Sequence, residues 1–256
     1  MTVSILLTAV LFLLMASIGR KKGIKSFFAL FLNLVLIAVT ILLICWQFDV
    51  AVLIVVNLLL ILLINLFFIN GENLKTVCAF LATSLTLIIL VAIIIPAVKY
   101  GMIQGFGEEQ QDTISGYTLS VGINFQKVAV YILAIASIGA IIDVAMSVSS
   151  AMYEMIRLNP RLSAGQLRHS GMKIGRDILG TTTNTLYFAF IGGYLTLMIW
   201  FKMLHYGFGA VLNAKVFASE VLSILSGAIG VVIVIPVTAS LGAWLLLRKQ
   251  KQIGEQ

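Results

Sequence analysis

Long apolar runs alternate with short polar segments along the whole chain. Crossing the hydrocarbon core of a bilayer as an α-helix takes about 20 apolar residues, and seven runs are of this kind. The pattern predicts an all-α, polytopic transmembrane bundle, with a single integral membrane domain over residues 1–256. The predicted membrane-spanning helices cover residues 2–18, 27–46, 50–69, 76–98, 128–150, 181–201 and 219–247.

The first apolar run is the shortest, so a signal peptide is an alternative interpretation of it. A signal peptide carries its positive charge before the apolar region. Here the basic stretch "GRKKGIK", residues 19–25, follows the run. We therefore expect the first run to be retained as a membrane-spanning helix.

Composition supports membrane residence, because 61% of the residues are apolar and only 11% are charged. Soluble domains are about half apolar and about a quarter charged. Thirteen of the 17 Lys and Arg residues fall in the segments that share one side of the membrane with the C-terminus. Cytoplasmic segments are the ones enriched in Lys and Arg. We therefore predict that the N-terminus lies outside and the C-terminus inside.

The net charge of +7 also bears on the partners of the protein. Because the basic residues gather on the predicted cytoplasmic side, anionic lipid headgroups are their expected partners. We expect no nucleic acid as a partner. The glycines of residues 171–180 lack the spacing and the Lys-Ser/Thr pair of a phosphate-binding loop, so we expect no nucleotide either.

A basic amphipathic helix is predicted between the fifth and sixth runs. Ser163 and Gln166 fit a capping box at its start. The apolar positions Leu167, Gly171 and Ile174 then share one face, while the basic residues lie off that face. Such a cytoplasmic helix is expected to lie on the inner membrane surface or along neighbouring helices.

The fifth run contains a carboxyl group, Asp143, in "GAIIDVAMSVSSAMYE". An Asp near the middle of a spanning helix costs about 2.5–3.5 kcal/mol on insertion scales, so it usually faces the bundle interior or a water-filled cavity. A stripe of small residues allows another helix to approach closely. We therefore expect Asp143 to point into protein, together with the small residues of its stripe: Ala136, Gly139, Ala140, Ser147 and Ser150.

Polar residues of the sixth run, "GTTTNTLYFAFIGG", are the predicted partners of Asp143. We expect Asn184 and the hydroxyl groups of Thr181, Thr182, Thr183 and Thr185 to hydrogen-bond its charged form. In this hypothesis Asp143 exchanges a proton or cation, Ser147 and Ser150 line a water path, and Glu220 of the seventh run is a secondary candidate. A structural polar clamp at Asp143 is the alternative interpretation. The functional residues thus fall in a back half, 128–247, while residues 1–98 form a lipid-facing front half.

The sequence contains no motif for metal binding or for enzymatic catalysis. The two histidines and two cysteines form no metal-binding spacing, so we predict neither a metal nor a cofactor. A single membrane aspartate without a second carboxylate nearby does not provide the pair that an aspartic protease uses. We therefore expect that the protein is not an enzyme.

Three segments together resemble the YibE/F family of multi-spanning bacterial membrane proteins: "GAIIDVAMSVSSAMYE", "GRDILGTTTNTLYFAFIGG" and "SEVLSILSGAIGVVIVIPVTA". By size, the chain resembles the shorter, F-type member. The resemblance implies a bacterial plasma membrane location and a heteromer with an E-type member.

The order of these segments is also similar to that in SecD, SecF and the resistance–nodulation–division permeases. That similarity implies a role of Asp143 in proton coupling, with Thr and Asn side chains facing it from the next helix. This chain lacks their large extracytoplasmic domain. From the similarity and the position of Asp143, we expect the protein to be an ion- or proton-coupled membrane transport component. The alternative function is a non-catalytic scaffold that stabilises the partner.

Overall fold

The computed structural model describes residues 2–105, 107 and 122–254. Every regular element within these ranges is a helix, which confirms the predicted all-α class. The helices are α1 (Thr2–Cys45), α2 (Val50–Leu63), the π-helix η1 (Ile64–Phe68), α3 (Leu74–Gly101), α5 (Phe125–Leu158), α6 (Ala164–Met203), α7 (Phe208–Asn213) and α8 (Lys215–Gly254).

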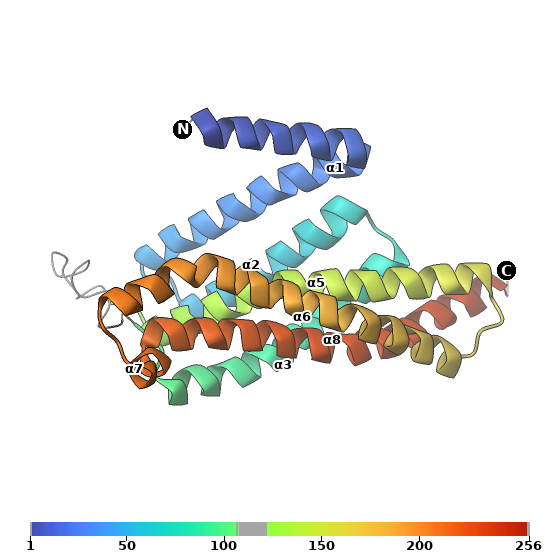
Figure 1. Cartoon of the computed structure of the whole chain (residues 1–256). Helices are drawn as coiled ribbons and strands as arrows, with labels where there is room; N and C mark the ends of the chain where they lie inside the picture. The colour runs from blue at the N-terminus through green and yellow to red at the C-terminus, as the bar shows by residue number, and fades with distance from the viewer. Residues whose placement is uncertain (1, 106, 108–121, 255–256) are drawn as a thin grey trace.

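Helix α1 contains the first two predicted spans, because it bends sharply at Arg20. The backbone of Arg20 has φ 48° and ψ −133°, which no helix adopts. The two arms fold back on each other, as Figure 1 shows, and the rings of Phe12 and Phe27 pack with their centroids 4.9 Å apart. Gly23 permits this close approach, since a Cβ there would overlap the Met15 carbonyl oxygen.

With the two arms of α1 counted separately, the structure contains the seven predicted spans; the others are α2 with η1, α3, α5, α6 and α8. Figure 1 shows the bend of α1, the η1–α3 connection, the α5–α6 connection and the C-terminus at one end of the molecule. The N-terminus, the α1–α2 turn and α7 lie at the other end. The end that contains the bend of α1 holds most of the basic residues, so the predicted orientation makes it the cytoplasmic end.

Helices α3, α5 and α8 form the centre of the bundle. Their interface buries large side chains completely, among them Leu90 of α3, Val148 of α5 and Val231 of α8. Close approach at one crossing depends on Gly230 of α8, where a Cβ would lie 2.6 Å from the Cδ1 atom of Ile141. The first arm of α1 instead exposes most of its apolar side chains, as expected for residues that face lipid.

Helix α6 joins the predicted amphipathic helix and the sixth span into one continuous element of 40 residues. The predicted capping box is present: the Gln166 amide donates to the Ser163 Oγ (3.3 Å), and the Ser163 amide donates to the Gln166 Oε1 (3.0 Å). Leu167, Gly171 and Gly175 are buried against α5 and α8. The amphipathic segment therefore lies along neighbouring helices, which is one of its two predicted locations; the other was the inner membrane surface.

An alanine at position 175 is expected to destabilise this packing. A Cβ there would overlap the Cγ2 atom of Ile235 and lie 3.0 Å from its Cγ1 atom, so α6 and α8 would have to separate slightly. Overpacking of this kind costs about 1–3 kcal/mol. The control is Gly180→Ala on the same helix, where no atom lies within 4 Å and alanine favours the helix. The midpoint temperature of thermal unfolding in detergent should be lower for Gly175→Ala than for wild type. Gly180→Ala should not lower this midpoint.

One ion pair fixes the α1–α2 turn to the start of α5. The Lys127 ammonium donates to the Asp49 carboxylate at 2.8 Å, and the Ala51 amide donates to the same carboxylate oxygen. These two hydrogen bonds lower the pKa of Asp49 below its usual value. Because the folded-state pKa is depressed, the contact stabilises the fold above about pH 4 and is lost as the pH falls through the lower folded-state value.

Replacing Lys127 by methionine should therefore raise the pKa of Asp49 toward its usual value. The ammonium hydrogen bond is the largest cause of the shift, and the Ala51 amide would retain part of it. Carboxyl-carbon NMR of labelled aspartate during an acid titration measures this change. A Lys99→Met control removes another cation without an ion pair to Asp49, so it should leave the titration unaltered.

Candidate functional site

Asp143 lies on an exposed stripe of α5. The residues that share this stripe are exposed in the single chain: Ile132, Ala136, Gly139 and Ser147. The two flanks of the stripe carry larger apolar residues, such as Ile142 and Val144, and these are buried. In the single chain, the stripe that sequence analysis expected to point into protein therefore faces outward at Asp143, while its members Ala140 and Ser150 are half-buried. The larger residues fill the bundle interior.

Besides its exposed position, the Asp143 side chain lines a cavity of about 390 Å³. Asn33 of α1 and Asn65 of η1 line the same cavity from the other side. The remaining lining is apolar or small and comes from α1, α2 and α5. The cavity therefore brings one carboxyl group and two amide groups together within an apolar surrounding.

The two asparagines form a reciprocal pair. The Asn33 Nδ2 donates to the Asn65 Oδ1 (3.2 Å), and the Asn65 Nδ2 donates to the Asn33 Oδ1 (3.3 Å). Asn65 uses its second amide hydrogen on the Ile61 carbonyl at 2.8 Å. The second amide hydrogen of Asn33 has no acceptor among the described residues, so a donor remains available to a carboxylate in the cavity.

Asn65 lies where the helix type changes. Residues Ile64–Phe68 form the π-helix η1, and the Asn70 side chain donates to the Asn65 carbonyl at 3.4 Å. Single π-turns within α-helices are rare and frequently occur at functional sites. Asn65 lies within this π-turn and faces Asn33.

The predicted α6 partners of Asp143 do not line its cavity. Thr181, Asn184 and Thr185 are exposed, while Thr182 and Thr183 are half-buried. The hydroxyls of Thr181 and Thr185 donate to carbonyls of their own helix, each at 2.9 Å. Within the described part of the chain, no hydrogen bond joins Asp143 to these five residues.

The remaining predicted residues take two places. Ser147 is exposed one turn from Asp143, and Ser150 is half-buried on the same helix. Glu220 belongs to a different cavity, of about 350 Å³, lined by residues from the first turns of α8 and α5. The Asp143 and Glu220 cavities share none of their lining residues, so the two carboxyl groups occupy separate sites.

Asp143 has no cationic partner in the described part of the chain, where the ion pairs involve Asp49 and Glu154. A carboxyl group in an apolar cavity favours its neutral form, because desolvation disfavours charge. Amide donors such as Asn33 favour the charged form. The site can therefore take up and release a proton or a small cation without breaking a fixed ion pair.

Sequence analysis missed Asn33 and Asn65 as members of this site. The signal was present, because an amide in the middle of a spanning helix must find a hydrogen-bond partner. Asn33 and Asn65 are two of the few polar residues within the first four spans. Their pairing with each other, and their position beside Asp143, required the arrangement of α1, η1 and α5.

Comparison with known proteins supports the resemblance noted in the sequence. The model of the family described as YibE/F-like protein matches residues 7–248, nearly the whole chain. No match was found among curated proteins or among solved structures. The match includes residues 7–18 of the first span, the other six spans in full, and Asn33, Asn65 and Asp143, and the chain therefore belongs to the YibE/F-like protein family.

Proposed function

We propose that this multi-span protein is a component of an ion- or proton-coupled membrane transporter in the bacterial plasma membrane. It works without enzymatic activity, and its coupling group is Asp143. The observation that carries this proposal is the cavity that Asp143 shares with the Asn33–Asn65 pair. Transporters use a carboxyl group without a cationic partner, in a cavity among membrane-spanning helices, to carry a proton or an ion.

The amide pair gives the carboxyl group two environments. When Asp143 is charged, the free amide hydrogen of Asn33 in the same cavity is available to hydrogen-bond it. When Asp143 is neutral, the asparagines satisfy each other and the cavity loses its charge. The difference between these two states allows loading of a proton or cation to change how α1 and η1 lie against α5.

The exposure of Asp143 supports the inclusion of a partner subunit in the proposal. A charged or polar group that faces lipid near the bilayer centre costs free energy, and membrane helices associate through small residues. The α5 stripe offers small residues next to Asp143, at Ala136, Gly139 and Ser147. We propose that a helix of an E-type family member covers this stripe and closes the cavity.

Reconstitution tests the transport function directly. The chain and its E-type partner are co-purified and placed in vesicles that contain a pH-sensitive dye. A pH gradient or a membrane potential is then imposed across the vesicle membrane. The complex should dissipate the gradient faster than protein-free vesicles do. Equal rates for the complex and for protein-free vesicles, under gradients of both directions, would exclude coupled transport of protons through this complex.

A non-catalytic scaffold is the second candidate function, and the exposed small-residue stripe favours it. In this case Asp143 would form a polar contact with the partner and would carry no ion. Asp143→Asn would then lower the amount of assembled complex, while the flux per complex would stay intact. Normalising the flux to the co-purified partner separates the scaffold from the transporter.

A further inference from the structure

A second cavity of about 350 Å³ lies between the first turns of α5 and α8, close to the end of α3. These turns are at the end of the molecule that carries the N-terminus, which is the predicted outer end (Figure 1). The cavity is separate from the one that contains Asp143. Its volume lies at the lower end of the range of small-molecule sites, about 300–1,000 Å³.

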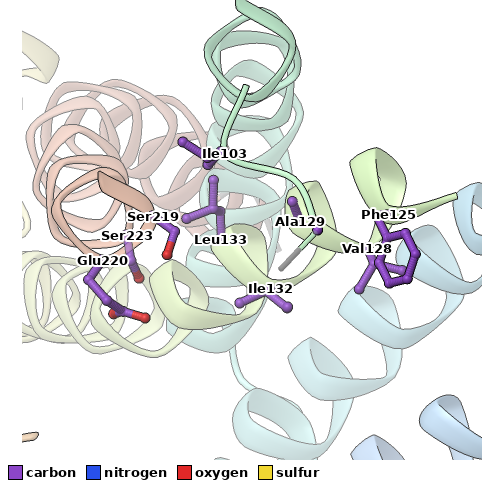
Figure 2. A pocket seen from close by; sticks show the side chains of 10 residues that line it. Ile103, Phe125, Val128, Ala129, Ile132, Leu133, Ser219, Glu220 and Ser223 are labelled. Carbon is purple, nitrogen blue, oxygen red and sulfur yellow. The ribbon is translucent and has the colours of Figure 1, made fainter. Parts of the chain in front are cut away.

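The two walls of this cavity differ in chemistry. Ser219, Glu220 and Ser223 of α8 form one wall, and Figure 2 shows their side chains grouped on the same side. Val128 and Ile132 are among the apolar side chains of α5 on the other side. An apolar cavity with a few polar groups that converge at one point is the usual form of a small-molecule site.

The charge of Glu220 is not compensated within the described part of the chain. Neither of the ion pairs there involves Glu220. Its carboxylate lies near the hydroxyl of Tyr194 from α6, which brings no positive charge. Ser219 uses its hydrogen on the Val216 carbonyl at 2.9 Å, so its oxygen can only accept. The polar wall therefore presents one negative charge and mainly acceptor oxygens.

These walls fit one class of ligand better than the others. A hard metal cation takes about six oxygen ligands, and one carboxylate facing an apolar wall does not provide them. A neutral apolar molecule would leave the charge of Glu220 unpaired, which is costly in an apolar site. An organic cation can interact favourably with both walls, since its charge would face the carboxylate and its carbon groups would face α5.

We propose that this cavity binds a small organic cation of the substituted ammonium class, with Glu220 as the counter-ion and the α5 wall as the apolar contact. The cation is either a free molecule from the outer side or the amine headgroup of a lipid. Both sources present the same ammonium group, and the experiment below distinguishes them.

Binding is measured by calorimetry on the full chain in nanodiscs made only of phosphatidylglycerol, which has no ammonium group. The probe is benzyltrimethylammonium. Wild type should bind it, and Glu220→Gln should bind it at least tenfold more weakly. Asp143→Asn changes the other cavity and should bind the probe as wild type does. A folded Ile132→Trp variant, which retains Glu220 but fills the cavity, should also lose the probe.

Adding phosphatidylethanolamine to the discs identifies the source of the ligand. Weaker apparent binding of the probe assigns the cavity to the lipid headgroup, and unchanged binding assigns it to a free cation. The proposal is overturned if wild type does not bind the probe, or if Glu220→Gln and Ile132→Trp bind it as wild type does. Because Asp143→Asn is included, these outcomes are independent of the proposed coupling function.

Discussion

Exchange of Asp143 for asparagine is expected to reduce the gradient-driven flux of the reconstituted complex to the rate of protein-free vesicles. Asparagine is nearly the same size as aspartate and can still hydrogen-bond in the cavity with Asn33 and Asn65. It cannot ionise, however, so it can neither release a proton nor hold a cation by charge. The dye-loaded vesicles described above measure this loss as a rate, normalised to the amount of co-purified partner.

Two variants make the result specific to the carboxyl group. Ser147→Ala alters the same exposed stripe one turn away and keeps Asp143, so its flux should stay within about threefold of wild type, a change of under about 0.7 kcal/mol. Asp143→Glu keeps a titratable group and should restore part of the flux. A wild-type rate for Asp143→Asn, at equal complex yield, would contradict the proposed role and leave the scaffold as the better explanation.

Features with short-range causes could be predicted from the sequence. The seven spans follow from hydropathy, which the bilayer enforces on every spanning helix. The capping box at Ser163 and Gln166 follows from hydrogen bonds between residues three apart. The continuity of α6 was missed, since the sequence was divided where the amphipathic segment gives way to the sixth membrane-spanning run. Gly180, a single glycine at that point, costs only about 1 kcal/mol and does not end a helix.

The direction of the Asp143 stripe could not be predicted for a different reason. Periodicity correctly groups Gly139, Asp143 and Ser147 on one face, because a helix has a fixed repeat. It does not say whether that face meets another helix of the same chain, lipid or a partner. The larger residues of α5 fill the bundle interior, and this leaves the face with Asp143 on the outside of the single chain. The Asn33–Asn65 pair was equally out of reach, because 32 residues separate its members and they lie on different helices.

Exchange of Gly139 for leucine is expected to reduce the amount of co-purified E-type partner at least tenfold. Gly139 is exposed on the α5 stripe, and no atom of this chain lies within 4 Å of the position of an added Cβ. The chain itself should therefore fold as before, and leucine favours the helix more than glycine does. A leucine would, however, keep a neighbouring helix from the close approach that small residues allow. Pull-down of a tagged partner from solubilised membranes measures the loss.

Gly193→Leu on α6 is the matched control. Gly193 is also exposed, and a Cβ there likewise meets nothing within 4 Å. Both variants add the same apolar side chain to a spanning helix, so a general effect on insertion or solubility would affect them equally. A loss of partner in Gly139→Leu alone places the interface on the α5 stripe. Equal yields in both variants would mean that the partner binds elsewhere, and Asp143 would then need another group to shield it from lipid.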